Sequence, residues 1–220
     1  MGWMGHLVLS DRLPAGLRAS TRSPSVVLTK EDRRALDTIF SCIGEYSMLF
    51  RMRKVILASA SYWRRELLKR AGVRFTVEVS GHRENLKQKL LPKMLVKKLA
   101  LEKARIVALR LRRRQAKRHP DAVIIAADTV AVLRGRVIGK PKNLAEARRI
   151  LTALSGARHS LLTGFAILDA KTGRAVVKSV TTNVWFRKLT KEEIEVYVQT
   201  KEPLTVAGGY AIQGGGASFA

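Results

Sequence analysis

Hydrophobic and polar positions form a regular pattern from residue 54 to the end of the chain. Short runs of β-branched and aliphatic residues predict buried strands, whereas apolar residues spaced three and four apart predict helices. The predicted strands cover residues 54–58, 75–80, 123–127, 130–133, 136–138, 160–168 and 175–186. The predicted helices cover residues 63–71, 92 to about 117, 144–155 and 191 to about 198. Strands and helices therefore alternate along this part of the chain.

Capping and turn residues agree with these boundaries. Asn143 with Glu146 and Thr190 with Glu193 match the signal in which a side chain caps a helix N-terminus. Residues 207–216 form a glycine-rich loop. Tight hairpins and longer crossovers both occur, so the sequence predicts a single α/β domain with a mixed sheet.

Residues 1–51 lack sustained periodicity, apart from one short helix expected at 29–40. Three interpretations compete: a disordered basic arm, an organelle-targeting peptide, or upstream sequence that is not native to the domain. The third is favoured, because Met52 stands directly before the first strong strand and acidic residues argue against a targeting peptide. We therefore expect a basic N-terminal extension at 1–51 and a domain at 52–220.

The chain is strongly basic, because 42 Lys and Arg against 17 Asp and Glu give a formal net charge of +25. Such a balance favours nucleic acid, anionic lipid or phosphorylated metabolites as partners, although a basic surface without a dedicated partner has the same composition. The single cysteine, Cys42, excludes an internal disulfide and favours a reducing, cytoplasmic compartment. No apolar run approaches the ~20 residues that cross a bilayer, so no membrane partner is expected.

Candidate chemistry begins where the first strand ends. Ser59, Ser61 and Arg64 lie in a short serine loop that opens directly into a helix. A helix N-terminus attracts phosphate through its unpaired N–H groups and its dipole, and a guanidinium matches phosphate oxygens. A capping serine followed by a surface arginine explains the same residues, and for this motif alone that simpler interpretation is the better one.

Carboxylates and lysines elsewhere supply further candidates. Asp128 follows a fully apolar strand, so it needs a cation, a metal or N–H partners, unless it simply starts a turn. Glu84 either joins Asp128 around a divalent cation or is solvated in a loop. Lys140, in a Gly-Lys-Pro turn, suits a phosphate contact or the open surface. Lys103 faces either a site or solvent from the long helix.

Several short segments are specific in their combined order and spacing. They are Leu57-Ala-Ser-Ala-Ser61 with Arg64 and Glu66-Leu-Leu68, Glu102-Lys-Ala104, Ala127-Asp-Thr-Val130, Gly139-Lys-Pro141, Leu154-Ser-Gly156 with His159, Thr163-Gly164, Glu202-Pro-Leu204 and Ala207-Gly-Gly-Tyr-Ala-Ile-Gln-Gly214. From about Lys54 onward, the chain thereby resembles the Maf (septum-formation) family of nucleoside triphosphate pyrophosphatases. The resemblance implies a Maf/ITPase-like single domain with a mixed, elongated and twisted β-sheet flanked by helices.

The same resemblance implies hydrolysis of a nucleoside triphosphate to a monophosphate and pyrophosphate, with a divalent cation, Mg²⁺ or Mn²⁺. It makes Asp128 the catalytic proton acceptor and, together with Glu84, a metal ligand. The substrate-binding residues that it implies are Ser59, Ser61, Arg64, Lys103 and Lys140. The implied mechanism is physically coherent, because an ionised aspartate accepts a proton from water while cations offset the phosphate charge.

Three residues bear on the preferred base. Thr129 and Gln213 match positions linked to base preference, and their pairing resembles members acting on dTTP and UTP. The resemblance therefore implies these or modified pyrimidine nucleotides. Trp63 stands where the family usually has arginine, and one subgroup with tryptophan there prefers a methylated guanine nucleotide, 7-methyl-GTP. The chain mixes both signatures, so both kinds of substrate stay open.

Two departures from the family favour another class of protein. Arg83 stands where an acidic residue often precedes Glu84. The chain stops at Ala220 where the family continues, so we expect the domain to lack its C-terminal end. The alternative to the enzyme is a catalytically impaired Maf-like fragment that acts as a basic nucleic-acid-binding protein. The nucleoside triphosphate is the favoured partner, and a homodimer stays open.

Overall fold

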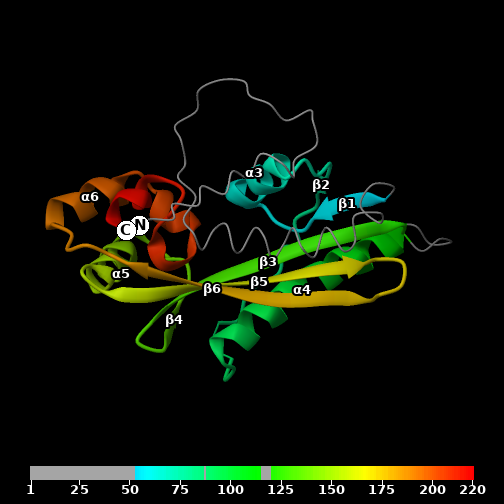
Figure 1. The fold of residues 1–220 in the computed structure, drawn as a ribbon, viewed down its shortest axis with the longest axis horizontal. Coiled ribbons are helices and arrows are strands. Elements are labelled where there is room, and N and C mark those ends of the chain that lie inside the picture. Colours follow the sequence, from blue (N-terminus) through cyan, green and yellow to red (C-terminus); the bar gives the residue numbers. More distant parts are fainter. Residues whose placement is uncertain (1–52, 87, 115–119) are drawn as a thin grey trace, which may run out of the picture.

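The computed structural model describes residues 53–86, 88–114 and 120–220. The expected N-terminal extension at 1–51, with its helix at 29–40, lies outside the described residues. Within the described chain, the helices are arranged around one long sheet (Figure 1).

The sheet is mixed, as the sequence predicts, and among the described residues it has six strands instead of the seven predicted. Its strands are β1 (Lys54–Leu57), β2 (Thr76–Val77), β3 (Ala122–Leu133), β4 (Arg136–Ile138), β5 (Arg158–Asp169) and β6 (Ala175–Trp185). Their spatial order is β2-β1-β3-β5-β6, and β4 pairs with the far part of β3. β1 is parallel to β2 and β3, whereas the other pairs are antiparallel. Helical crossovers thus precede a run of antiparallel strands.

The described chain also contains helices and short 3₁₀ turns. They are α3 (Tyr62–Arg70), α4 (Pro92–Arg114), α5 (Leu144–Leu154), α6 (Lys191–Gln199), η2 (Glu202–Thr205), η3 (Ala207–Gly209) and η4 (Gly215–Phe219). α4 runs along one face of the sheet and α3 lies on the opposite side, whereas α5, α6 and the 3₁₀ turns gather at one end (Figure 1).

Strand alternation decides which helix each core side chain meets. Ile56, Ile124 and Ala126 point to one face and pack with α4, whereas Leu57 and Ile125 point to the other face and pack with α3. A second core joins α5 and α6 to the C-terminal turns, and its aromatic members are Phe186, Tyr197, Tyr210 and Phe219. The central strands are covered on both faces, which explains their continuous apolar sequence.

The largest departure from the predicted elements is in β3. The pattern predicts two strands that break at Asp128, but the structure has one strand of 12 residues. Asp128 and Thr129 pair across the ladder with Gly164 and Thr163 of β5. Because the backbone hydrogen bonds to β5 carry the strand through these polar residues, the interpretation of Asp128 as a turn residue is wrong.

The predicted strand at 75–80 is also shorter in the structure, where only Thr76–Val77 pairs with β1. The Glu78 N–H still donates to the Leu57 carbonyl at 3.1 Å, but β1 ends at that residue. The carbonyls of Val79 and Ser80 instead accept hydrogen bonds from the Arg110 guanidinium at 2.8 and 2.6 Å.

Both predicted N-terminal caps are confirmed. The Asn143 side chain accepts a hydrogen bond from the Glu146 N–H at 2.8 Å. Thr190 and Glu193 form the reciprocal capping box of α6. The glycine-rich segment at 207–216 is not an open loop, because η3 and the start of η4 lie in it.

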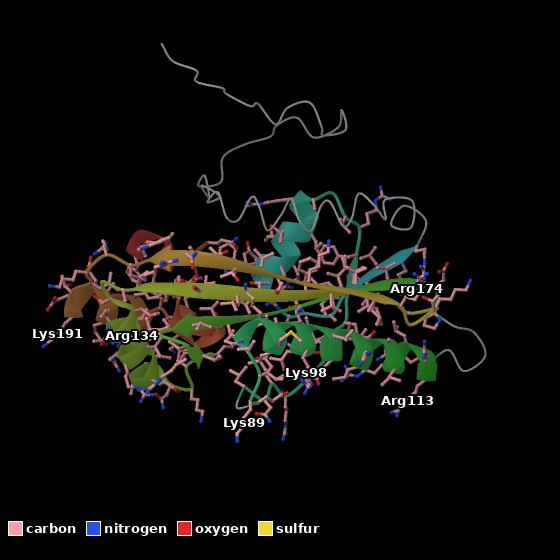
Figure 2. The ribbon with its side chains drawn as sticks, turned by 60° about the horizontal axis from the view of Figure 1, so that its bottom comes forward. Lys89, Lys98, Arg113, Arg134, Arg174 and Lys191 are labelled. Atoms are coloured by element: carbon pink, nitrogen blue, oxygen red, sulfur yellow. The ribbon has the colours of Figure 1, made fainter. Side chains whose placement is uncertain are left out.

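Basic side chains are spread over the described surface. Figure 2 shows Lys98 and Arg113 along α4, Arg134 near the other end of the sheet and Lys191 at the start of α6. The labelled basic residues therefore lie on several separate elements of the described chain. Among the described residues, no helix combines the length and the apolar character needed to cross a membrane.

Candidate functional site

A gap along one edge of β3 forms the floor of the site. β1 pairs with β3 only as far as Ile125, and β4 begins to pair with β3 at Ala131. Between these points, residues 126–130 have no strand beside them on that edge among the described strands. The guanidinium of Arg64, near the start of α3, reaches into the gap and donates to the Ala127 carbonyl at 2.8 Å.

The gap opens into a cleft of about 790 Å³. Its walls come from the β1–α3 loop, the loop before α4, the strands β3, β5 and β6, the β4–α5 loop and the C-terminal turns. Every candidate site residue from the sequence lines this one cleft, namely Ser59, Ser61, Trp63, Arg64, Glu84, Lys103, Asp128, Thr129, Lys140 and Gln213. The fold therefore brings together segments that are far apart in the chain.

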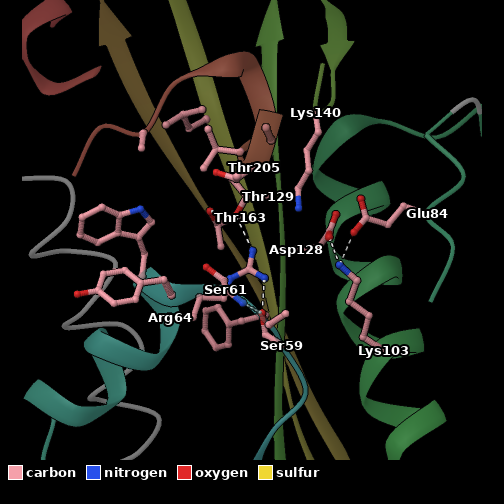
Figure 3. Close-up of a pocket in the computed structure, with 18 of the residues that line it drawn as sticks. Ser59, Ser61, Arg64, Glu84, Lys103, Asp128, Thr129, Lys140, Thr163 and Thr205 are labelled. Atoms are coloured by element: carbon pink, nitrogen blue, oxygen red, sulfur yellow. Dashed lines mark hydrogen bonds and ion pairs between the residues drawn. The ribbon is translucent and has the colours of Figure 1, made fainter. Parts of the chain in front are cut away.

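Buried charges occupy the side of the cleft next to α4 (Figure 3). The Lys103 ammonium donates to Glu84 Oε1 at 2.6 Å and to Asp128 Oδ1. Asp128 is only 2% exposed and Lys103 only 8% exposed, so this pair is withdrawn from solvent. The other oxygen, Asp128 Oδ2, is buried without a hydrogen-bond partner among the described residues. Such an oxygen is costly unless a ligand or a proton occupies it.

Burial and neighbouring charges shift the pKa of both carboxyls. Burial raises the pKa of Asp128, the Lys103 charge lowers it and the Glu84 charge raises it, so the result lies above the usual value. Burial also raises the pKa of Glu84, but the hydrogen bond and charge of Lys103 bring it below its usual value. Asp128 is therefore the better proton acceptor of the two.

The serine loop and Arg64 lie on the other side of β3. The buried Ser59 hydroxyl accepts hydrogen bonds from the Ser61 N–H at 3.2 Å and from Arg64 Nη1 at 3.1 Å. Ser61 occupies the N-cap position of α3, yet its side chain makes no capping hydrogen bond. The simpler interpretation, a capping serine and a surface arginine, is therefore wrong, because the hydroxyls and the guanidinium face the cleft.

Three oxygen atoms of the protein hold Arg64. Nη1 donates to Ser59 Oγ and to the Ala127 carbonyl, and Nη2 donates to Thr129 Oγ1 at 3.1 Å. A guanidinium has five N–H bonds. The Nε–H and one Nη2–H thus have no acceptor among the described residues, and together they match two phosphate oxygens. Burial lowers the pKa of Arg64, against the raising effect of the nearby carboxylates.

Lys140 reaches the cleft from the β4–α5 loop. In Figure 3 its amine points toward the two carboxylates, and its charge contributes to the lowered pKa of Glu84. Gly139 lets this loop pass close to its neighbour, because a Cβ there would lie 2.5 Å from Leu86 Cδ1. The Gly139 carbonyl also accepts the Gly208 N–H at 2.9 Å. The lysine loop is therefore tied to the C-terminal turns.

The residues expected to read the base lie at separate points on the cleft wall. Trp63 follows Tyr62 at the start of α3, and their rings make an edge-to-face contact with centroids 5.2 Å apart. Gln213 lies in the C-terminal segment between η3 and η4. Thr129 is bound to Arg64, which places its hydroxyl beside the guanidinium.

Two residues of β5 contribute to the site although the sequence indicated no role for them. Thr163 lines the cleft, and its hydroxyl lies 3.0 Å from that of Thr129. Gly164 lets α4 cross β5 closely, because a Cβ there would lie 2.3 Å from the Val96 carbonyl carbon. Thr163 and Gly164 form one of the short sequence segments quoted above. The sequence does not show which groups they face, because these depend on strand register and helix packing.

The two carboxylates form the candidate cation site. Among the described residues, no group of three or more His, Cys, Asp or Glu side chains is placed to hold a metal ion. Mg²⁺ commonly takes only one or two protein carboxylates, together with substrate phosphates and water. Glu84 and Asp128 fit that arrangement, because Lys103 contacts one oxygen of each and holds the two carboxylates together. The basic Arg83 is not among the cleft-lining residues.

Known proteins resemble this chain in sequence and in structure. Residues 54–220 match the Maf-like protein family. A dTTP/UTP pyrophosphatase of Desulforamulus reducens is 47% identical over 163 residues, which cover 74% of this chain and 81% of that protein. A dTTP/UTP pyrophosphatase of Moorella thermoacetica is 47% identical over 166 residues, with coverage of 76% and 81%. The Ham1 protein of Staphylococcus aureus is similar over 61% of this chain and 72% of its own, with a TM-score of 0.40 and 14% identity.

Proposed function

The chain belongs to the Maf-like protein family, and we propose that it is a nucleoside triphosphate pyrophosphatase that releases a monophosphate and pyrophosphate. One observation carries this proposal. A single cleft joins a buried carboxylate that has one unpartnered oxygen to guanidinium, ammonium and hydroxyl groups from distant segments. The relatives at 47% identity are dTTP/UTP pyrophosphatases, and we infer dTTP and UTP as substrates here.

The triphosphate lies across the gap in the sheet edge, so that both sides of β3 reach it. Arg64 offers its Nε–H and one Nη2–H to phosphate oxygens. The N-terminus of α3, with the free hydroxyl of Ser61, adds further donors, and Lys140 adds positive charge. These groups offset the negative charge on the phosphate oxygens in the transition state, which supplies most of the catalysis in phosphoryl transfer.

Asp128 accepts the proton of the attacking water. The water oxygen bonds to the α-phosphorus, the bond from that phosphorus to the oxygen bridging to the β-phosphate breaks, and pyrophosphate leaves. Lys103 holds Oδ1 of Asp128, which fixes the carboxylate and leaves Oδ2 as the proton acceptor. The raised pKa makes Asp128 a stronger base than an ordinary aspartate.

Glu84 and Asp128 would hold the divalent cation, Mg²⁺ or Mn²⁺. When bound, the cation supplies Lewis-acid polarisation of the phosphate oxygens. Lys103 keeps the two carboxylates side by side through its contact with one oxygen of each. Chelation of divalent cations is expected to abolish pyrophosphate release, and separate additions of Mg²⁺ and Mn²⁺ identify the working metal.

The preferred base is addressed by a panel of triphosphates. We propose dTTP, UTP or modified pyrimidine nucleotides, in agreement with Thr129 and Gln213. The alternative, 7-methyl-GTP, follows from Trp63, since an indole at the cleft wall stacks on any base. Comparison of kcat/KM for pyrophosphate release from dTTP, UTP, GTP and 7-methyl-GTP decides between them.

Asp128→Asn tests the mechanism most directly. The substitution keeps the size of the side chain and removes its basic oxygen, so kcat for pyrophosphate release is expected to fall by about 10²- to 10⁴-fold. Asp121→Asn is the matched control, because Asp121 is an exposed aspartate outside the cleft that pairs with Arg53. Unchanged turnover in Asp128→Asn would overturn the mechanism.

Nucleic-acid binding by an inactive Maf-like protein is the competing outcome. It predicts binding that falls steeply with salt and no turnover of any triphosphate. The basic residues labelled in Figure 2 lie on several separate elements and do not form one cluster. We further propose a cytoplasmic location, because a chain with one cysteine suits the reducing compartment.

A further inference from the structure

We propose that Thr163 is a positioning residue for the phosphate site. Its hydroxyl orients the Thr129 hydroxyl, which in turn holds Arg64 with two N–H bonds open to the substrate. This inference rests on the proposed pyrophosphatase function, since it assigns Arg64 to the phosphates of the triphosphate. It also gives Thr129 a task at the phosphates, in addition to the base preference that the family resemblance implies.

The contact between the two threonines follows from strand register. Thr129 of β3 and Thr163 of β5 stand directly opposite each other in the antiparallel pair. Side chains at opposite positions leave the same face of the sheet and interact. Their hydroxyl oxygens are 3.0 Å apart, and both residues line the cleft. Figure 3 shows Thr163 beside Thr129, with the Arg64 guanidinium next to them.

The number of donors and acceptors on the Thr129 hydroxyl shows how the contact with Thr163 orients it. A threonine hydroxyl has one proton and two lone pairs. One lone pair of Thr129 accepts Arg64 Nη2–H, and the contact with Thr163 uses either the second lone pair or the proton. In both cases the Thr129 hydroxyl is held with a lone pair toward the guanidinium. Without Thr163, this hydroxyl is free to turn its proton toward Nη2–H, which repels it.

The position of Nη2 decides where Arg64 aims its free N–H groups. Nη1 already donates to Ser59 and to the Ala127 carbonyl. With these two contacts alone, the guanidinium can still rotate about Nη1. The hydrogen bond from Nη2 to Thr129 Oγ1 prevents that rotation. The N–H groups without an acceptor, Nε–H and the second Nη2–H, are then fixed as a pair that faces the substrate phosphates.

Thr163→Val tests the proposal, because valine keeps the branched shape and removes only the hydroxyl. We expect KM for dTTP to rise about 3- to 10-fold, the size of one net hydrogen bond, with a smaller change in kcat. We expect the dissociation constant for inorganic pyrophosphate, measured by calorimetry, to rise by a similar factor. Thr163→Ser keeps the hydroxyl and should restore both values to near those of the unmodified protein.

Two controls distinguish a positioning role of the Thr163 hydroxyl from a general disturbance of packing. Thr181→Val makes the same chemical change at an exposed position of β6 outside the cleft, and it should leave KM unchanged. In Arg64→Lys protein, adding Thr163→Val should cause no further loss, because the positioned group is absent. A full Thr163→Val effect in that background, or an equal loss in Thr163→Ser, would overturn the proposal.

The two proposals fail in distinguishable ways. If the unmodified protein releases no pyrophosphate from any triphosphate, the proposed function fails. Weaker pyrophosphate binding by Thr163→Val, restored in Thr163→Ser, would still support the positioning role. If turnover is normal while Thr163→Val changes neither KM nor pyrophosphate binding, the function stands and the positioning role is wrong.

Discussion

The two sides of β3 hold their charged groups in opposite ways. Next to α4, two carboxylates are held by a single ammonium, which compensates one of the two negative charges inside the protein. On the α3 side, the Arg64 guanidinium is held by uncharged oxygens of two hydroxyls and one carbonyl. Neutral acceptors fix its position without cancelling its charge. The first arrangement stabilises acid and base groups, and the second keeps a full positive charge for an anionic ligand.

Both arrangements meet at one strand because neighbouring residues of a strand point to opposite faces. Asp128 points toward α4 and Thr129 toward α3. Beside these two residues, the β1 edge of β3 has no neighbouring strand among the described strands. A ligand in the gap therefore touches both sides at once. Variants that disturb one side and leave the other intact test this division.

Lys103→Met is expected to have the largest effect, because it removes the ammonium that contacts both carboxylates of the α4 side. Removal of one partner from a buried pair costs about 3–5 kcal/mol in the free energy of unfolding. Burial already raises the pKa of Asp128, and Lys103 lowers it, so loss of the lysine raises that pKa further. More Asp128 is then protonated and inactive at any given pH, and the acid limb of the activity profile moves to higher pH.

Urea unfolding at pH 7 and kcat/KM against pH measure these two effects of Lys103→Met. Lys98→Met is the matched control, since Lys98 is an exposed lysine on the same helix and lies outside the cleft. Its stability should change by less than about 0.5 kcal/mol. An acid limb that does not move in Lys103→Met would contradict the role given to that ammonium.

Gly164→Ala should disturb the α4 side by a smaller amount. The new methyl group would meet the α4 backbone at Val96, and overpacking of this kind costs about 1–3 kcal/mol. Displacement of α4 moves Lys103 away from Asp128, so kcat should fall, whereas pyrophosphate binding through Arg64 should change less. Urea unfolding, turnover and calorimetry measure the three quantities. An unchanged unfolding midpoint would contradict the close approach of α4.

Glu195→Gln should have the smallest effect, because it removes a partly exposed ion pair between α5 and α6 that does not line the cleft. Glu195 accepts hydrogen bonds from Arg148 at 2.5 and 2.7 Å, which lowers its pKa to about 2. The unfolded value is about 4.3, so the stabilisation is full above that pH and is lost as the pH falls toward the folded value.

The urea midpoints of Glu195→Gln and the unmodified protein should therefore differ slightly at pH 7 and converge as the pH is lowered through 3. Turnover should not change. A midpoint difference that grows on acidification would have the wrong sign for a carboxylate whose pKa is depressed in the folded state.

Local sequence signals were sufficient for most elements. Apolar runs predicted the central strands, and capping residues predicted the starts of α5 and α6. They failed at β3, since a local pattern treats an Asp-Thr pair as the end of a strand. The ladder to β5 supplies backbone partners through that pair and extends the strand to 12 residues. Non-local hydrogen bonds therefore overrode the local pattern.

Prediction of the site from the sequence was limited in the same way, by contacts between distant segments. Residue types alone left Arg64, Asp128 and Lys140 open between site chemistry and simpler structural roles, and the family resemblance assigned them to the site. The structure places these side chains in one cleft. The sequence left open whether Lys103 faces a site or solvent, because a helix pattern with basic residues on several sides allows both. Packing of α4 on the sheet resolves that choice, since it buries Lys103.

By itself, the sequence determined which charged and hydroxyl residue types the chain offers, and the two-residue alternation of side chains within each predicted strand. Only the tertiary structure decided which groups meet. The register of β5 sets Thr163 against Thr129, and the approach of α4 to Gly164 brings Lys103 to Asp128. The physical reason is that covalent geometry governs the direction of each side chain along its own strand. Its neighbours, by contrast, come from strand pairing and helix packing between segments far apart in the chain.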